Sequence, residues 1–322
     1  MINPRRRWVS VLVWLPVLPF TVWAVLRVGG WTPAWQWVPL VAFTPYVAAA
    51  SAVPLLAALA SRRRAATAVA LVTCVTLAAA VLPRHFGGDE QPAAGGRLRV
   101  LATNLAVGAG DTATLMKLVR DLDPDVLAIQ EITPAARDRL DEAGLRTTMP
   151  HVVDRAVDGV WGSAIYARHP ITEKPMIEKG RFRQARGVLK HPSGHEIEVV
   201  SVHPCAPRYD YKVQCWAEGL QALPRAGGRQ LRVLAGDFNA TLDHGLVRDL
   251  LAGGYRDAAD VTGLGLTATW PQQGWEPVPG VAIDHVFADS RMTINTFGVH
   301  SLPHTDHRPV FAELGLPRHA SG

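Results

Sequence analysis

Residues 231–239 read LRVLAGDFN, an apolar run that ends in a glycine, a carboxylate and an amide. A run of this kind predicts a buried strand over 231–235. Residues 236–239 then stand at the end of that strand. Taken alone they are equally consistent with an ordinary turn, in which an Asp or Asn side chain accepts a backbone hydrogen bond. The stretch becomes informative because similar arrangements recur along the chain.

Five other predicted strands have polar side chains at or beside their ends. Asn104 follows 99–102, Glu131 follows 126–129, His203 follows 199–202, Asp284 interrupts 281–287, and Asp306 and His307 precede 310–312. Strands from distant parts of a chain can end at the same edge of a sheet, so we expect these groups to share one crevice. Each also has a plain structural reading, such as a turn residue for Asn104 or a satisfied core histidine for His203.

From residue 98 onward, short apolar runs alternate with polar stretches of helical pattern. The pattern predicts helices over 112–121 and 209–223 among the strands. Strands and helices mixed in this way indicate an α/β or α+β domain. Residues 98–315 form this predicted domain.

Three motifs of the domain are specific in combination. They are GDFN at 236–239, TDHRP at 305–309, and a G-x-A-I-x-x-R strand at 162–168. Together they resemble the endonuclease/exonuclease/phosphatase superfamily, the fold shared by DNase I, exonuclease III-type enzymes, sphingomyelinases and inositol-polyphosphate 5-phosphatases. Thr305 stands where serine is common in that family. The resemblance implies a DNase I-like four-layered α/β sandwich with metal-dependent phosphoesterase activity.

The resemblance also implies a site for Mg²⁺ or Mn²⁺. Glu131 is expected to be the main metal ligand, with Asn104 beside it and Asp306 as a further or second-site ligand. These residue types suit the ion, because Mg²⁺ prefers oxygen ligands and one or two carboxylates suffice.

The remaining motif residues are expected to act on the phosphate. By the resemblance, Asp237 orients or deprotonates the attacking water, and Asn239 and His203 hold phosphate oxygens. His307 stabilises the negative charge of the transition state, and Asp284 holds its other ring nitrogen. Such a carboxylate keeps an imidazole in one orientation and favours its protonated form.

Arginines and cysteines of the domain leave two alternatives open. Arg183 and Arg186 either clamp a second phosphate of the substrate, since arginine matches phosphate oxygens bidentately, or belong to a solvated basic turn. Cys205 and Cys215 either form a disulfide, as thiols outside the cytoplasm tend to do, or remain free.

The first 83 residues contain no acidic residue and read as a membrane anchor. Three uncharged runs, 8–26, 38–60 and 65–83, are each close to the length of about 20 residues that crosses a bilayer. We therefore expect three transmembrane helices, followed by a Gly/Pro/Ala-rich linker over 84–97. A cleaved signal peptide at the first run is the alternative.

Basic residues predict the orientation of the anchor. Arg5, Arg6 and Arg7 precede the first run, and Arg62–Arg64 separate the second from the third. Under the positive-inside rule both clusters are cytoplasmic. Three crossings then give a multi-pass protein of the cell membrane with its catalytic domain outside the cytoplasm.

Charge and position bear on the substrate. Residues 1–96 carry eight arginines and two acidic residues, whereas the remainder carries 25 basic and 26 acidic residues. The near-neutral domain lacks the basic surface of a dedicated nucleic-acid binder. The plan of three spans before this domain resembles bacterial membrane phosphoesterases linked to teicoplanin resistance. That resemblance favours a lipid-linked phosphate or pyrophosphate of the cell envelope as the substrate. The alternatives are a cell-surface nuclease and a non-catalytic anchored interaction module.

Overall fold

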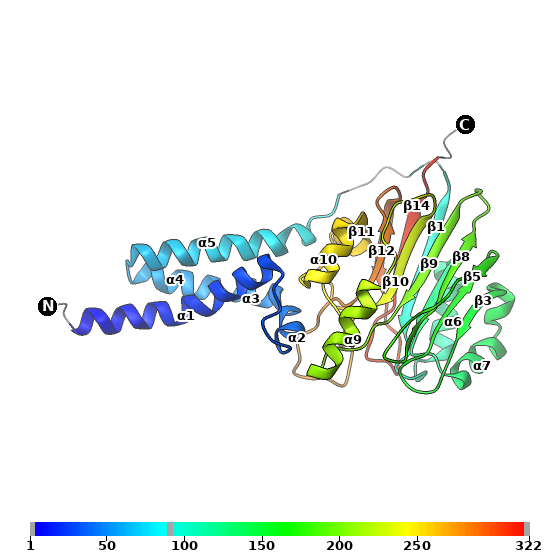
Figure 1. Ribbon diagram of the computed structural model, residues 1–322, viewed down its shortest axis with the longest axis horizontal. Coiled ribbons are helices and arrows are strands. Elements are labelled where there is room, and N and C mark those ends of the chain that lie inside the picture. The colour runs from blue at the N-terminus through cyan, green and yellow to red at the C-terminus, as the bar shows by residue number, and fades with distance from the viewer. Residues whose placement is uncertain (1–3, 89–92, 94, 319–322) are drawn as a thin grey trace.

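A computed structural model describes residues 4–88, 93 and 95–318. Two six-stranded sheets face each other across the main core (Figure 1). In order, the first sheet contains β13 (Thr293–Val299), β14 (Val310–Gly315), β1 (Arg97–Asn104), β2 (Val126–Gln130), β4 (Ser163–Ala167) and β3 (His151–Arg155). The second contains β11 (Tyr255–Asp257), β12 (Asp284–Asp289), β10 (Leu231–Asp237), β9 (Glu196–Val202), β8 (Arg186–Lys190) and β5 (Ile171–Glu173).

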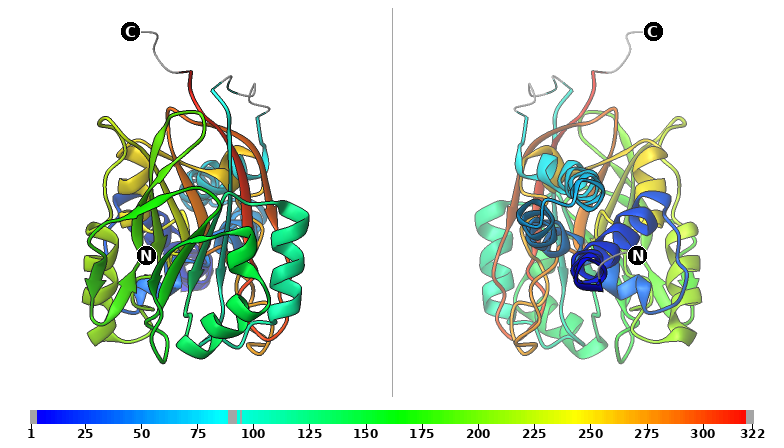
Figure 2. Two further views of the ribbon diagram at one scale, coloured as in Figure 1. Left: turned by 90° about the vertical axis from the view of Figure 1, so that its right-hand side faces the viewer. Right: turned by 90° about the vertical axis from the view of Figure 1, so that its left-hand side faces the viewer.

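Helices cover the outer face of each sheet, so that the domain has four layers (Figure 2). Against the first sheet lie α6 (Thr112–Leu122), α7 (Pro134–Glu142) and α8 (Leu145–Thr148). Against the second lie α9 (Asp210–Gln221) and α10 (Gly245–Ala252). The hairpin β6 (Ile177–Lys179) with β7 (Phe182–Gln184) and the short helix α11 (Ala258–Val261) complete the domain. The predicted four-layered α/β sandwich is confirmed.

The core explains why these runs become strands. Alternate side chains of β1, β10, β12 and β14 fill the space between the sheets, among them Val100, Val233, Val286 and Val310. The other face of each strand packs on the outer helices. Burial on both faces requires nearly continuous apolar runs, which is the pattern that the sequence has.

The N-terminal region is a bundle of apolar helices that projects from one end of the sandwich (Figure 1). It contains α1 (Pro4–Gly29), α2 (Trp37–Val41), α3 (Thr44–Ala50), α4 (Ala52–Ala60) and α5 (Arg64–Val81), followed by the 3₁₀ turn η1 (Leu82–His85). Among the described residues, two helical stretches are long and apolar enough to cross a membrane, Val11–Gly29 and Arg64–His85.

The second of the three predicted spans differs from the other two. Residues 38–60 form three short helices instead of one, and the longest apolar stretch, Thr44–Ala60, falls below the length of the others. Prolines at 39, 45 and 54 account for the breaks, since proline favours the first turn of a helix and disrupts its interior. The sequence prediction of three full transmembrane helices is therefore supported for two.

The predicted linker also differs at its first residues. Arg84 is buried and donates two hydrogen bonds to the carboxylate of Asp243, at 2.7 and 2.8 Å. Gly88 then donates its backbone N–H to Val261. The chain from η1 to Gly88 is thus packed on the sandwich, because the guanidinium meets a buried carboxylate that local sequence does not reveal. Residues 89–92 and 94 of the predicted linker lie outside the described part of the chain.

Candidate active site

The polar residues at the strand ends meet at one edge of the two facing sheets. Asn104 ends β1, and Glu131 follows β2, which runs parallel to β1. Asp237 ends β10 and is the register partner of Asp284, the first residue of the antiparallel strand β12. Because the sheets face each other, four strands from distant parts of the chain deliver their carboxylate and amide groups to one crevice.

Backbone geometry at this edge demands particular residues. Gly236 has a φ of 143°, and a Cβ there would lie 2.4 Å from the carbonyl oxygen of Val202 and 2.6 Å from Nε2 of Gln130. No larger side chain fits that space. Glu131 and Asn239 have left-handed φ angles of 54° and 49°. Such conformations cost energy in non-glycine residues and gather at functional sites.

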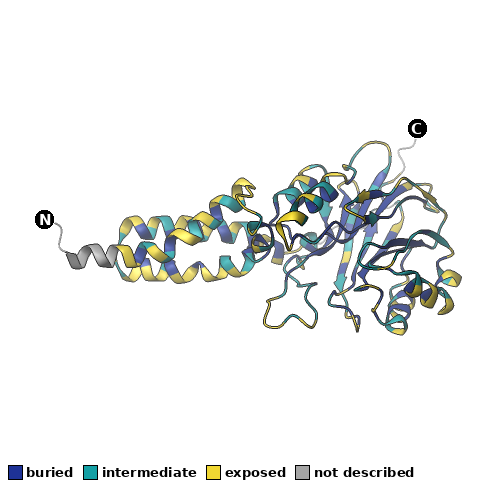
Figure 3. Cartoon of the chain, turned by 60° about the horizontal axis from the view of Figure 1, so that its bottom comes forward, coloured by how far each residue is buried: buried dark blue, intermediate teal, exposed yellow. Residues whose placement is uncertain are grey.

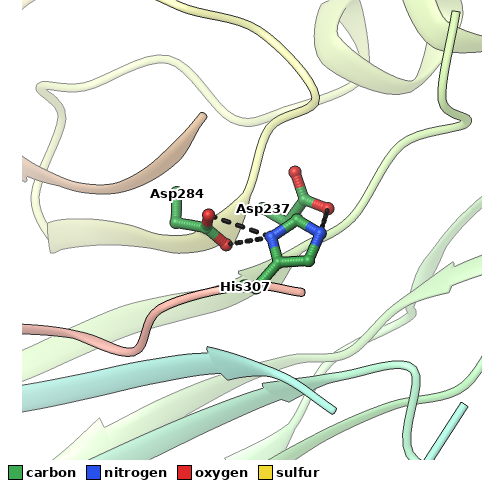
Figure 4. Close-up of side chains that lie close together, drawn as sticks. All are labelled: Asp237, Asp284 and His307. Atoms are coloured by element: carbon green, nitrogen blue, oxygen red, sulfur yellow. Dashed lines mark hydrogen bonds and ion pairs between the residues drawn. The ribbon is translucent and has the colours of Figure 1, made fainter. Parts of the chain in front are cut away.

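His307 lies between two carboxylates (Figure 4). Its Nδ1 is 3.0 and 3.1 Å from the two oxygens of Asp284, and its Nε2 is 3.6 Å from Oδ2 of Asp237. Burial lowers the pKa of His307, but Asp284 and Asp237 raise it further, to about 10. The imidazole therefore carries a positive charge at neutral pH. Burial in turn raises the pKa of Asp237.

Asn104 links two acidic side chains of the site. Its amide nitrogen donates to Oε1 of Glu131 at 3.3 Å and to Oδ2 of Asp237 at 3.1 Å. Its own oxygen accepts from the backbone N–H of Ala106. Burial raises the pKa of Glu131, against the hydrogen bond from Asn104 that lowers it.

His203 faces the same pair of carboxylates. Its Nε2 lies 3.6 Å from Oε1 of Glu131 and 3.7 Å from Oδ2 of Asp237. Burial lowers the pKa of His203 to about 4, so that this imidazole is neutral at pH 7. Its Nδ1 is buried and has no hydrogen-bond partner among the described residues.

Asp306 is held from one side by two indoles. Oδ2 accepts hydrogen bonds from Nε1 of Trp270 at 2.9 Å and of Trp275 at 2.8 Å. Oδ1 lies 4.0 Å from Nε2 of His307. Burial raises the pKa of Asp306, but His307 and the two indole donors lower it below its usual value. This carboxylate is thus ionised and oriented toward the other polar groups.

Most of the polar residues of the site line a cavity of about 470 Å³. Its polar wall is formed by Glu131, His203, Asp237, Asn239, Asp306 and His307, with the basic side chains Arg208 and Lys212. Asn239 donates its side-chain amide to the carbonyl of Pro204 and its backbone N–H to Asp237. The arrangement is an open site in which carboxylates, imidazoles and an amide face a common volume.

The residues present suit a divalent cation. Glu131 and Asp306 line one cavity, and the pKa of Glu131 is raised chiefly by burial and to a smaller extent by the charge of Asp306. A hard cation between such oxygens would offset the repulsion between them. Asp237, Asp284 and His307 also lie close enough to share one ion, with ligand atoms within 4.8 Å of one another. The two neighbouring carboxylates keep His307 protonated, however, and a protonated imidazole does not bind a metal ion. The carboxylates of Glu131 and Asp306 are therefore the better match for Mg²⁺.

The predicted arginine clamp is not brought to this cavity. Arg186 forms an ion pair with the buried carboxylate of Glu198, which also accepts from Arg232 at 2.6 Å. Neither Arg183 nor Arg186 is among the described residues that line the cavity. Local sequence places the arginines together but does not show that a buried glutamate in β9 takes one of them.

Two positioning residues have no distinct signal in the sequence. Thr269 accepts the backbone N–H groups of Ile283 and Asp284, both at 3.0 Å, and so fixes the start of β12. Trp275 holds Asp306, as described above.

The two cysteines of the domain, Cys205 and Cys215, form a disulfide with Cα atoms 5.8 Å apart.

Comparisons with known proteins agree with this fold. The family model described as "Endonuclease/Exonuclease/phosphatase family" matches residues 101–307. No curated protein sequence shows significant similarity.

Solved structures share the fold at low sequence identity. An endonuclease/exonuclease/phosphatase from Beutenbergia cavernae is 18% identical, with a TM-score of 0.54 over 69% of this chain and 72% of that one. The 3'-5' exonuclease NExo from Neisseria meningitidis is 21% identical, with a TM-score of 0.52 over 68% and 100%. D. rerio TDP2, complexed with a single-strand DNA product, is 14% identical, with a TM-score of 0.51 over 68% and 99%.

Proposed function

The chain belongs to the endonuclease/exonuclease/phosphatase family, and from that premise we propose that it is a metal-dependent phosphoesterase acting on a phosphate presented at a membrane. One observation carries the enzymatic part. Glu131, Asp237, Asp306 and His307 line a single cavity, in a balance of negative and positive charge that suits a phosphate and a divalent ion.

In the proposed reaction, Asp237 accepts a proton from a water molecule that attacks phosphorus. Its raised pKa suits a general base. The P–O bond to the leaving group breaks, its electron pair stays on the leaving oxygen, and that oxygen takes a proton from solvent. Protonated His307 offsets the charge that develops on the phosphate oxygens, and Asn239 and His203 hold those oxygens.

Glu131 and Asp306 would hold the divalent ion, with Asn104 beside Glu131. When bound, the ion would offset phosphate charge and polarise the bond under attack. Asp284 and Asn104 act through other residues: Asp284 orients His307, and Asn104 keeps the carboxylates of Glu131 and Asp237 in place.

The membrane part of the proposal rests on the helical bundle. Exposed residues run along the sides of the bundle (Figure 3). They include the large apolar residues Leu12, Leu15, Val22, Leu56 and Val72, each more than half exposed. Exposed apolar surface of this extent is typical of contact with lipid. A disulfide between Cys205 and Cys215 suits a domain outside the cytoplasm. We therefore propose a substrate that is a lipid-linked phosphate or pyrophosphate.

A surface nuclease is the second candidate. Structures of similar fold include proteins solved with DNA products. Residues 97–322 carry one more acidic than basic residue, however, and affinity for nucleic acid depends largely on cationic contacts to phosphates. The lipid-linked substrate is therefore the better supported of the two.

The test is hydrolysis by the full chain in detergent with Mg²⁺. The panel contains undecaprenyl pyrophosphate, phospholipids, sugar phosphates and plasmid DNA. We expect phosphate release from the lipid-linked substrate and its loss in Glu131→Gln, with Glu142→Gln as a control because Glu142 is exposed at the end of α7. Calorimetric titration with Mg²⁺ alone should show weaker binding to Glu131→Gln. Full turnover in EDTA would refute metal dependence, and rapid DNA cleavage without release from the lipid would favour the nuclease.

The link to glycopeptide resistance is a separate prediction. Expression of the chain in a teicoplanin-sensitive host should raise the minimum inhibitory concentration, and the Glu131→Gln variant should not.

A further inference from the structure

The active-site cavity has an apolar wall that comes from the N-terminal bundle. Pro39, Ala42 and Phe43 line the same cavity as Glu131 and His307. Pro39 lies in α2, and Ala42 and Phe43 lie in the turn between α2 and α3, at the end of the bundle nearest the sandwich (Figure 1). Apolar side chains of the sandwich continue the wall, namely Val107, Val160, Val278, Val281 and Ile283.

This wall is built into the structure and is held by specific contacts. His244 Nε2 is 2.9 Å from the carbonyl oxygen of Val38, and the hydroxyl of Tyr46 donates to the carbonyl of Gly280 at 2.6 Å. Ala42 packs with Val281 and Ile283 in a small buried cluster. The segment from Val38 to Tyr46 is thus anchored to the sandwich on both sides of its cavity-lining residues.

The polar and apolar walls share one volume. A cavity of about 470 Å³ holds the carboxylates and imidazoles together with Pro39, Ala42 and Phe43. A substrate whose phosphate lies on the polar wall would therefore place its nearest carbon atoms on the apolar wall. The wall also adjoins the bundle whose sides expose apolar residues, so a hydrocarbon chain leaving the cavity would meet apolar surface.

We propose that Pro39, Ala42 and Phe43 form an apolar subsite for a hydrocarbon chain esterified directly to the substrate phosphate. The inference rests on the proposed phosphoesterase function and names the chemical class of its substrate. Ala42 and Phe43 are specificity-determining residues in this assignment. A phosphate separated from its chain by glycerol, or a nucleotide, would place polar atoms on the same wall and desolvate them without partners.

The experiment compares substrates that differ only in chain length. The full chain in lipid nanodiscs is given n-butyl, n-hexyl, n-octyl and n-decyl monophosphates and the matching diphosphates, below their micelle-forming concentrations. Burial of a methylene group contributes about 0.8 kcal/mol, which corresponds to about a fourfold gain in kcat/KM. We expect kcat/KM to rise by up to about that factor per added methylene and to level off once the subsite is filled.

Variants in the wall test which residues form the subsite. Phe43→Ala should lower the ratio of kcat/KM for decyl to butyl substrates about tenfold, since it removes apolar contact area. Ala42→Leu should shorten the chain length at which the rise stops. Leu40→Ala is the matched control, because Leu40 lies in the same segment but is exposed and is not among the described residues that line the cavity. Its ratio should equal that of the wild type. Misfolded protein lowers both rates of a variant equally, so the ratio remains a valid readout.

The outcomes separate the subsite from the function on which it rests. Cleavage of butyl phosphate or diphosphate that needs Glu131 but does not increase with chain length would overturn the subsite and leave the phosphoesterase standing. A lysophosphatidic acid of equal chain length that is cleaved faster than decyl phosphate would overturn the direct linkage. No cleavage of any chain length, with or without added metal, would overturn the proposed function itself.

Discussion

His307 gains its charge from its neighbours. Its Nδ1 lies 3.0 Å from one oxygen of Asp284, and Nε2 faces Asp237 at 3.6 Å. His203 is buried too and faces Asp237 at 3.7 Å, but its Nδ1 has no partner among the described residues, and burial lowers its pKa to about 4. Two histidines within one cavity therefore differ in charge: His307 is positive and suited to offset phosphate charge, whereas His203 is neutral and suited to share hydrogen bonds.

We expect His307→Ala to lower kcat by about 10²–10³, the usual loss when an electrostatic stabiliser of a transition state is removed. Asp284→Asn should cost less, because the amide still orients the ring but no longer supports its charge. Steady-state kinetics on the substrate that the hydrolysis panel identifies measures both, with circular dichroism as the check on folding. Near wild-type kcat in His307→Ala would mean that His307 does not act on the phosphate.

Among elements, the loop after β10 joins the active site to the bundle. This loop follows Asp237 and contains Asn239, and Asp243 near its end accepts from Arg84 of η1 and from Arg27 of α1 at 3.0 Å. Asp243 is fully buried, and the arginines are largely buried. The bundle thus fixes the far end of the loop that follows the proposed general base, Asp237.

Asp243→Ala should destabilise the protein by about 3–5 kcal/mol, because it leaves two buried guanidinium groups without their carboxylate. Thermal unfolding of the full chain in nanodiscs measures this. Asp249→Ala is the control, since Asp249 lies nearby in α10 and is exposed. Equal unfolding temperatures for the two variants would show that the ion pairs do not hold the bundle to the sandwich.

The contact between His244 and α2 predicts a pH dependence of stability. Burial lowers the pKa of His244 to about 4, and its neutral ring donates to Val38 and accepts from the N–H of Thr241. The unfolded chain takes up a proton near pH 6.5, whereas the folded chain does so only near pH 4. Stability from this residue is therefore complete above about pH 6.5 and is lost as pH falls toward 4.

Protonation of His244 should lower the free energy of unfolding by about 3 kcal/mol at most, which follows from the difference between its pKa in the folded and in the unfolded chain. Denaturation of the wild type and of His244→Gln at pH 7.5, 6, 5 and 4.5 isolates it, because other titrating groups are common to both. The difference in unfolding free energy between the two proteins should shrink as pH falls. A constant difference would contradict a buried, neutral His244.

On the scale of the whole molecule, the bundle predicts the topology. In Figure 1, the N-terminal end of α1 and the turn between α4 and α5 lie far from the sheets, whereas the end of α5 meets them. The two arginine clusters of the sequence fall at that far end. Although α3 and α4 are short, the chain therefore traverses the bundle three times, which is consistent with a catalytic domain on the opposite side from the N-terminus.

We expect an alkaline phosphatase fusion at the C-terminus to be active and a green fluorescent protein fusion there to be dark. Fusion to the intact chain is the appropriate form, because truncation near Gly96 would separate Arg84 from Asp243. Fusions to the N-terminus should give the opposite pattern. A fluorescent, phosphatase-inactive C-terminal fusion would place the domain in the cytoplasm and refute the three-crossing topology.

The sequence by itself determined where the strands that carry the site residues lie and which side chains stand at their ends. The runs before Asn104, Glu131 and Asp237 are apolar on both faces because each strand is buried between the opposite sheet and outer helices. That burial leaves a local signal, and so do the polar residues that interrupt it. The family motifs added roles that periodicity alone could not assign.

The tertiary structure alone decided which distant surfaces meet. Arg84 reads as the start of a linker, yet it is buried on Asp243, and Arg186 reads as part of a basic cluster, yet it pairs with Glu198. Phe43 reads as part of a membrane span, yet it lines the active-site cavity. Local sequence records how apolar a segment is, but a contact between residues far apart in the chain depends on packing of the whole molecule. For that reason the charged partners and the apolar wall appear only once the bundle and the sandwich are placed together.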